Sequence, residues 1–285
     1  MPSRERHQPT LFIIGGAEAR TGRGSLLRRF VKLAGGKRAR IAVIPTASSF
    51  QDEVVTAYTA AFTAFGAAEV TSVNPTSRHA AHDPQLVATL DAATGIYPGG
   101  GSQLKLSQFF LGTPAGDAIH RAYARGAIIG GTSAGASIMS DYMISLGEEG
   151  TTPKQRTSQL SAGLGLITGC VIDQHFDQRS RYGRLMSVIA PSPQLVGIGI
   201  DEDTAIIVTD GREFTVRGKG AVFVVDARFA HTDAPDARRG APLLVSGAVV
   251  HTLPAGATFD LTTMSLTGFV EMHPDLVVTR ALAKA

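Results

Sequence analysis

Short apolar segments rich in β-branched residues recur along the first two thirds of the chain, with longer helical patterns between them. The six segments are residues 11–16, 40–48, 70–74, 95–100, 127–131 and 170–174. One helical pattern, from Leu26 to Leu33, places its apolar residues on a single stripe before two glycines, a typical helix end. Continuous apolar runs that alternate with helices are typical of buried parallel strands. We therefore predict an open, doubly wound, mostly parallel sheet over roughly the first 190 residues.

The pattern changes after Leu195, where apolar segments follow one another through short Gly, Asp and Pro turns. Such spacing is typical of antiparallel β-hairpins, which we expect either to extend the sheet or to pack beside it. We predict a single α/β domain over residues 11–285, with a β-rich C-terminal part from about residue 196. The polar residues 1–10 are expected to be disordered or loosely ordered.

Composition limits the classes of protein that fit this pattern. The chain has 285 residues, 44% of them hydrophobic and 18% charged, as in a globular protein. No apolar run reaches the ~18 residues of a membrane span, and no signal peptide is evident, so we expect a cytoplasmic protein without a membrane partner. The net charge of +3 does not by itself indicate nucleic-acid binding. Cys170 is the single cysteine, and nucleotide and zinc motifs are absent, so we expect no disulfide, metal or cofactor.

The segment 131–135, Gly-Thr-Ser-Ala-Gly, fits the G-x-S-x-G pattern of a nucleophilic serine. About 0.2 chance matches are expected in a chain this rich in glycine, but here an apolar strand precedes the motif and a helical pattern follows it. We interpret Ser133 as a nucleophile; the alternative is an ordinary glycine-rich loop. Backbone N–H groups of Ala134 and of the glycine turn at Gly100 and Gly101 would then form an oxyanion hole.

A serine nucleophile needs a base and, behind it, an orienting carboxylate. Of the eight histidines, His175 lies at the carboxyl end of a predicted buried strand, where catalytic residues of α/β sheets are found. Glu202 follows another apolar strand, and strand alternation turns it away from its neighbours Asp201 and Asp203. We favour Glu202 as the carboxylate, with Glu148 and Glu149 as competing candidates.

After His175 come three arginines within a stretch of six residues: Arg179, Arg181 and Arg184. Guanidinium groups suit bidentate carboxylate binding, so this cluster indicates a substrate with acidic groups. The alternative is that these arginines are solvated or paired with nearby carboxylates, namely Asp173, Asp177 or Asp201.

Several motifs occur in the same order as in the cyanophycinase family of serine peptidases, which is related to aspartyl dipeptidase. They are "FIIGGAE", "AVIPTAS", "GGTSAGAS", "VIDQHF" with "QRSRYGRL", and "GIGIDEDTA". The resemblance covers about residues 11 to 225. It implies a flavodoxin-like sheet resembling that of class I glutamine amidotransferases, a homodimer, and cofactor-free hydrolysis of cyanophycin (multi-L-arginyl-poly-L-aspartate) to β-Asp-Arg dipeptides.

By this resemblance, Ser133 matches the nucleophile, His175 the base and Glu202 the acidic member of a catalytic triad. The residues that match the family's substrate pocket are Gln103, Asp173, Gln174, Arg179, Arg181 and Arg184. The sequence departs from the family pattern in "PGGGSQ" and in "GGAEART". Two alternatives therefore stay open: an aspartyl or isoaspartyl dipeptidase acting on soluble peptides, and a non-catalytic binding member of the fold.

Overall fold

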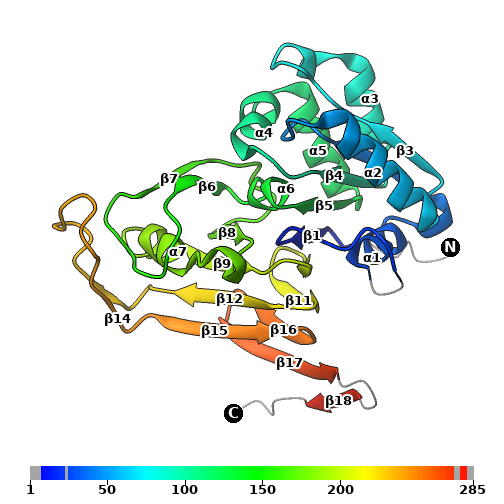
Figure 1. Cartoon of the computed structure of the whole chain (residues 1–285). Coiled ribbons are helices and arrows are strands. Elements are labelled where there is room, and N and C mark those ends of the chain that lie inside the picture. Colours follow the sequence, from blue (N-terminus) through cyan, green and yellow to red (C-terminus); the bar gives the residue numbers. More distant parts are fainter. Residues whose placement is uncertain (1–7, 23–24, 273–276, 281–285) are drawn as a thin grey trace.

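The computed structural model describes residues 8–22, 25–272 and 277–280. Its largest feature is a ten-stranded sheet in the order β18-β17-β16-β11-β10-β1-β5-β4-β2-β3 (Figure 1). Five neighbouring strands of this sheet are parallel: β1 (Thr10–Ile14), β5 (Ile128–Thr132), β4 (Gly95–Pro98), β2 (Arg40–Ile44) and β3 (Glu69–Ser72). Each of these five strands overlaps one of the predicted apolar segments.

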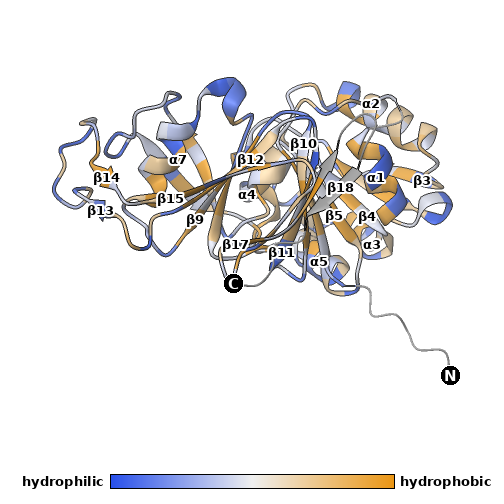
Figure 2. Ribbon diagram, turned by 90° about the horizontal axis from the view of Figure 1, so that it is seen from below, coloured by the Kyte–Doolittle hydropathy of each residue, from blue (hydrophilic) through white to orange (hydrophobic). Residues whose placement is uncertain are grey.

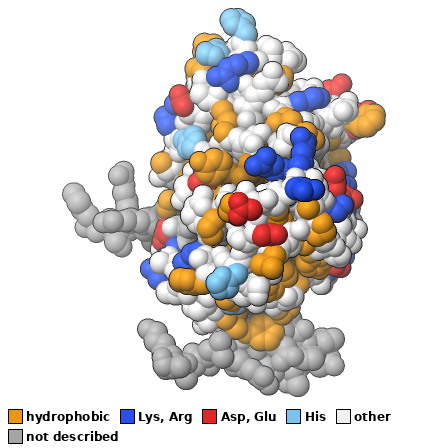
Figure 3. All heavy atoms as spheres, turned by 90° about the vertical axis from the view of Figure 1, so that its left-hand side faces the viewer, with side chains coloured by type: hydrophobic (Ala, Val, Ile, Leu, Met, Phe, Trp, Pro, Cys, Tyr) orange, Lys and Arg blue, Asp and Glu red, His pale blue; other side chains and the backbone are white. Residues whose placement is uncertain are grey.

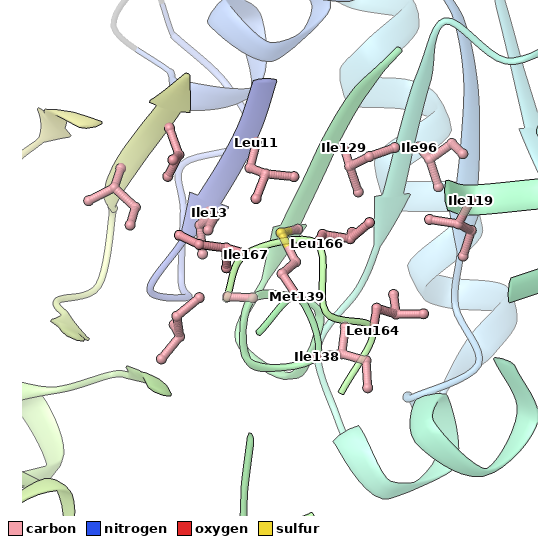
Figure 4. Packing of buried hydrophobic residues seen from close by; sticks show 14 of the residues in the cluster. Leu11, Ile13, Ile96, Ile119, Ile129, Ile138, Met139, Leu164, Leu166 and Ile167 are labelled. Carbon is pink, nitrogen blue, oxygen red and sulfur yellow. The ribbon is translucent and has the colours of Figure 1, made fainter. Parts of the chain in front are cut away.

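Helices cover both faces of the parallel strands, as the doubly wound prediction requires. Alternate residues of β1 point to opposite faces: Phe12 packs with α1 (Leu26–Leu33) and α2 (Gln51–Ala64), whereas Leu11 packs on the other side. That second layer contains α3 (Pro84–Ala92), α4 (Gln103–Phe110) and α5 (Pro114–Ala124). Figure 4 shows Leu11, Ile129 and Ile96 from three adjacent strands on one side of the sheet, with Ile119 of α5 beside Ile96. The α/β fold class is confirmed.

Part of the β-rich C-terminal region extends the sheet and part forms a second sheet, so both expected arrangements occur. Strand β10 (Thr204–Thr209) pairs antiparallel with β1, from Thr10 opposite Thr209 to Ile14 opposite Ala205. The strands added beyond it are β11 (Glu213–Gly218), β16 (Ala257–Asp260), β17 (Ser265–Met272) and β18 (Val277–Arg280). The expectation for residues 1–10 falls mostly outside the described residues, and the single domain stays a prediction.

A second, four-stranded sheet contains β8 (Cys170–Gln174), β9 (Val196–Ile200), β12 (Ala221–Asp226) and β15 (Val249–Pro254). Strands β8 and β9 are parallel, and the other two pair antiparallel. The prediction that residues 170–174 continue the first sheet is therefore wrong. The apolar pattern of a buried strand is the same in either sheet, so periodicity alone could not separate the two.

The remaining elements connect or cover these two sheets. The hairpin of β6 (Tyr142–Gly147) and β7 (Ser158–Ala162) leads the chain from the first sheet to the second, after the short helix α6 (Ala134–Ser137). Helix α7 (Tyr182–Ile189) packs on β9, and β13 (His231–Thr232) pairs with β14 (Val245–Ser246). Figure 2 shows apolar ribbon segments concentrated within the packed layers and polar ones toward the periphery.

Replacement of Phe30 by Ala should destabilise the fold, because this fully buried ring of α1 contacts the rings of Phe12, Phe62 and Tyr97. The expected loss is about 3–5 kcal/mol in the free energy of unfolding. Chemical denaturation monitored by circular dichroism checks it. The control is Arg29→Ala on the exposed side of the same helix, expected to stay within about 0.5 kcal/mol of the wild type. If both variants lose the same free energy of unfolding, the side of α1 that carries Phe30 is not the buried one.

Candidate active site

Ser133 lies on a sharp turn between strand β5 and helix α6. Its backbone has φ 53° and ψ −112°, a conformation that is uncommon for a residue with a side chain. The turn needs glycine on both sides: a Cβ on Gly135 would lie 2.0 Å from the carbonyl oxygen of Pro98, and one on Gly131 would lie 2.4 Å from that of Gly135. Only hydrogen at these positions lets the backbone close this tightly, and the turn presents the serine side chain above the sheet.

The structure brings together the serine, histidine and glutamate predicted from the sequence. Ser133 Oγ lies 3.1 Å from His175 Nε2, and Glu202 Oε1 lies 2.6 Å from His175 Nδ1. When Nδ1–H donates to the carboxylate, Nε2 carries the lone pair and accepts the serine proton. His175 itself has φ 47° at the end of β8, so both reacting side chains are held by uncommon backbone conformations.

The surroundings of His175 favour its neutral, basic form. Burial lowers the pKa of its imidazole, and the positive charges of Arg179 and Arg181 lower that pKa further. Glu202 acts in the opposite direction by accepting the ring hydrogen bond, but the net pKa shift is downward. The imidazole is therefore unprotonated at neutral pH, as a general base must be.

The competing carboxylates lie elsewhere. Glu149 pairs with an arginine at 3.1 Å, and Glu148 pairs with a lysine at 3.3 Å. Asp201 and Asp203, the neighbours of Glu202, accept hydrogen bonds from backbone N–H groups. Glu202 is thus the candidate carboxylate whose oxygen reaches the imidazole.

The glycine turn after β4 lies against the serine. A Cβ on Gly100 would be 3.4 Å from Cβ of Ser133, so the backbone itself approaches the nucleophile. Gly101 has φ 133°, and a Cβ there would lie 2.1 Å from the carbonyl oxygen of Ala47. Within the described part of the chain, the N–H groups of Gly100, Gly101 and Ala134 have no hydrogen-bond acceptor. Unpaired N–H groups of this kind next to a serine are suited to hold an oxyanion.

The three arginines have different environments. Arg184 is buried and bonds Asp173, which is fully buried, through Nε at 2.8 Å and also through Nη2. Arg181 is buried as well, and donates to the carbonyl oxygen of Gln174 at 2.7 Å and to Glu149. For Arg181 and Arg184, the structure therefore supports the alternative that they pair with nearby carboxylates of the protein.

Arg179 differs from the two buried arginines, because 49% of its side chain is exposed. Its nearest carboxylate is Glu149, at 3.9 Å. Of the three guanidinium groups, the one on Arg179 is therefore open to a ligand.

The two predicted pocket glutamines have different contacts. The amide oxygen of Gln174 lies 3.3 Å from Ser133 Oγ, and the side chain of Gln103 donates to the carbonyl oxygen of Ile144 at 2.7 Å. The second contact ties the glycine turn to the β6–β7 hairpin. Of the two amides, the one on Gln174 contacts the serine directly.

Sequence reasoning missed the glycines at the end of β1. The carbonyl oxygen of Gly15 accepts a hydrogen bond from His175 N at 2.7 Å, and a Cβ on Gly16 would lie 2.3 Å from the imidazole ring. The available signal was the glycine pair at the carboxyl end of a buried strand, which marks a close backbone approach.

Three further properties of the molecule are relevant to this site: surface charge, groups that could bind a metal ion, and helices that could span a membrane. Figure 3 shows acidic and basic side chains intermixed on the face at the left of Figure 1. No group of three or more His, Cys, Asp or Glu residues suited to a metal ion occurs in the described residues. In the same part of the chain, no helix has the length and apolarity that a bilayer span requires.

A doubly wound sheet that carries a serine on a strand–turn–helix turn defines the class of α/β serine hydrolases. The chain belongs to peptidase family S51, whose model matches residues 11–216. The family resemblance seen in the sequence is thereby confirmed, and the protein is a serine-type peptidase.

Similar proteins support the assignment over most of the chain. A cyanophycinase from Nostoc sp. (strain PCC 7120) is 36% identical over 253 residues, covering 88% of this chain and 85% of that protein. A cyanophycinase from Geminocystis herdmanii is 33% identical over 265 residues, covering 92% and 97%. The crystal structure of a peptidase from an acI-B1 actinobacterium matches with a TM-score of 0.64 at 20% identity, covering 90% and 98%. This last match shows a shared fold.

Reactivity of Ser133 should rise with pH, with a midpoint below the ordinary imidazole value of about 6.5, because burial and two arginines lower the pKa of His175. Arg179→Gln removes one of these charges and should move the midpoint upward. The rate of covalent labelling by a fluorophosphonate, measured from acidic to neutral pH, checks both. Arg121→Gln on exposed α5 is the matched control and should leave the midpoint unchanged. A midpoint unchanged in the Arg179 variant would contradict this account.

Glu202→Gln should lower kcat by about 10³- to 10⁴-fold, because the amide cannot stabilise the imidazolium that forms in the transition state. Glu149→Gln should lower it by a far smaller factor, since Glu149 contacts arginines rather than the imidazole. Glu148→Gln, at an exposed ion pair, serves as the control. Steady-state kinetics of the three variants checks the ranking, and a larger loss at Glu149 would reverse the assignment.

Proposed function

We propose that this peptidase hydrolyses cyanophycin as an exopeptidase and releases β-Asp-Arg dipeptides. One observation carries the proposal: the hydrogen-bonded series Ser133, His175 and Glu202 occurs in a chain whose curated relatives at 33–36% identity are named cyanophycinase. The site geometry supports acyl transfer, and the relatives supply the substrate class.

The reaction would proceed through a covalent acyl-enzyme. Ser133 Oγ attacks the carbonyl carbon of the scissile amide while its proton passes to His175 Nε2. N–H groups of Ala134, Gly100 and Gly101 hold the negative oxygen of the tetrahedral intermediate. As the C–N bond breaks, His175 gives the proton to the leaving amine. Water then attacks the ester, His175 takes its proton, and that proton returns to Ser133 Oγ as the acid product leaves.

Glu202 would act through His175 at both proton transfers. Its carboxylate, 2.6 Å from Nδ1, fixes the tautomer that leaves Nε2 free and stabilises the imidazolium that forms when Nε2 is protonated. The low pKa of the free imidazole ensures that the base starts in its neutral form.

Substrate recognition would combine one open guanidinium with the two amides. A β-Asp-Arg unit carries a free carboxylate, for which Arg179 is the exposed cationic partner. Gln174 and Gln103 would contact the polar backbone of the substrate near Ser133. We assign Arg181, Arg184 and Asp173 a supporting part in this pocket, because their polar groups are already engaged with one another and with Gln174.

Insoluble cyanophycin incubated with the protein should release β-Asp-Arg, identified by mass spectrometry. Ser133→Ala should lower the rate by about 10⁴-fold or more, since the nucleophile is removed. Ser72→Ala on the edge strand β3 is the matched control and should retain full activity.

Soluble β-aspartyl and α-aspartyl dipeptides form a second arm of the experiment. Cleavage of dipeptides without release from the polymer would replace the proposed substrate by the dipeptidase alternative. Binding without turnover of any of these compounds would assign a non-catalytic role instead.

A further inference from the structure

A buried carboxylate that the proposed reaction does not use lies beneath the nucleophile turn. Glu18 is 7% exposed and follows strand β1 by four residues. Three hydroxyl groups donate to it: Tyr58 at 2.5 Å and Tyr97 at 3.0 Å to Oε1, and Thr132 at 2.5 Å to Oε2. Burial of a carboxylate is costly unless such donors satisfy it.

We infer that Glu18, through its hydrogen bond with Thr132, is a positioning residue for the nucleophile Ser133. This inference rests on the proposed function, because it assigns Ser133 the reacting oxygen. Thr132 is the last residue of β5 and precedes Ser133 directly. No other side chain in this network is adjacent to a member of the Ser133–His175–Glu202 series along the chain.

The backbone at Ser133 requires such support. A φ of 53° is a sparsely populated conformation for a non-glycine residue, and it persists only when the surroundings fix it. Two contacts from the β1 segment do so: the carbonyl oxygen of Ile14 accepts from Ser133 N at 3.1 Å, and Glu18 accepts from the Thr132 hydroxyl. The turn at Ser133 is therefore held by a hydrogen bond of its main chain and by the side chain of Thr132, the residue before it.

The segment that carries Glu18 also contacts His175 and the residue that follows Glu202. Gly15 accepts a hydrogen bond from the backbone of His175. The residue after Glu202, Asp203, donates from its backbone to Gly16 at 2.8 Å and accepts from Ala19 N at 3.0 Å. Residues 15–19 therefore set the distances among nucleophile, base and carboxylate, and Glu18 anchors this segment from inside.

The tyrosines make this anchor rigid. Tyr58 from α2 and Tyr97 from β4 lie with ring centroids 5.0 Å apart, and both pack on Phe62. Burial, and after it the charge of Glu18, raise the pKa of both phenols, so both remain protonated donors. The carboxylate thus joins β1, β4, β5 and α2 at a single point.

The test compares three threonine variants. Thr132→Val removes the hydroxyl with little change in shape and should lower kcat by about 10- to 100-fold, with KM nearly unchanged, because small displacements of a reacting group cost rates of this order. Thr132→Ser keeps the hydroxyl and should restore most of the rate. Thr113→Val removes another buried hydroxyl, the N-cap of α5, and should lower the melting temperature without lowering kcat.

A double-mutant cycle separates positioning from general destabilisation. Glu18→Gln should also lower kcat, because it replaces the charged acceptor of the Thr132 hydroxyl by a neutral amide. Combining it with Thr132→Val should cost little more than the larger single loss, because both variants act on the same hydrogen bond. Fluorophosphonate labelling of Ser133 should slow in parallel, and this readout needs no cyanophycin.

Two results would lead to different conclusions. If Thr132→Val lowers the melting temperature but leaves kcat and the labelling rate at wild-type values, Glu18 is structural only and the inference is overturned. If the wild type is labelled at Ser133 but does not hydrolyse cyanophycin, the proposed substrate fails. The comparison of labelling rates then still decides the role of Glu18.

Discussion

The close backbone contact at the end of β1 is the constraint on which the site depends. Ser133 follows a strand of the ten-stranded sheet, whereas His175 and Glu202 follow strands of the second sheet. A Cβ on Gly15 would lie 2.1 Å from the carbonyl oxygen of Asp201, and one on Gly16 would enter the imidazole ring. Two glycines here let the sheets approach within hydrogen-bonding distance, and a serine from one sheet can meet a base from the other.

Much of the fold could be predicted from the sequence, because continuous apolar runs and glycine helix ends are local signals. The α1 boundaries and the five parallel strands follow from them. The division into two sheets could not be predicted, since β8 and β5 are both buried along their whole length and the strand partners that separate them are not a local signal. That partner depends on the β6–β7 hairpin, whose polar strands carry a weak pattern.

The candidate site divides in the same way. Ser133, His175 and Glu202 each follow an apolar strand, and the sequence shows this locally. Their meeting depends on the approach of two sheets at Gly15 and Gly16, which the sequence does not show. The different environments of the three arginines could not be predicted from the sequence, because the partner of Arg181, Glu149, is 32 residues away along the chain. The motif residue Glu18 likewise shows its contacts only in three dimensions, since its partners are 40 to 114 residues away.

The charged residues around His175 are arranged so that most of the nearby arginines are paired with carboxylates. A site for acidic substrates needs cations near the nucleophile, but each uncompensated cation lowers the pKa of the base and weakens it. The structure neutralises the buried cations, with Asp173 on Arg184 and Glu149 on Arg181, and leaves Arg179 as the open one. Glu202 opposes the remaining field by hydrogen bonding the imidazole. An arginine cluster can therefore lie beside a general base because its carboxylate partners are built into the same strands and loops.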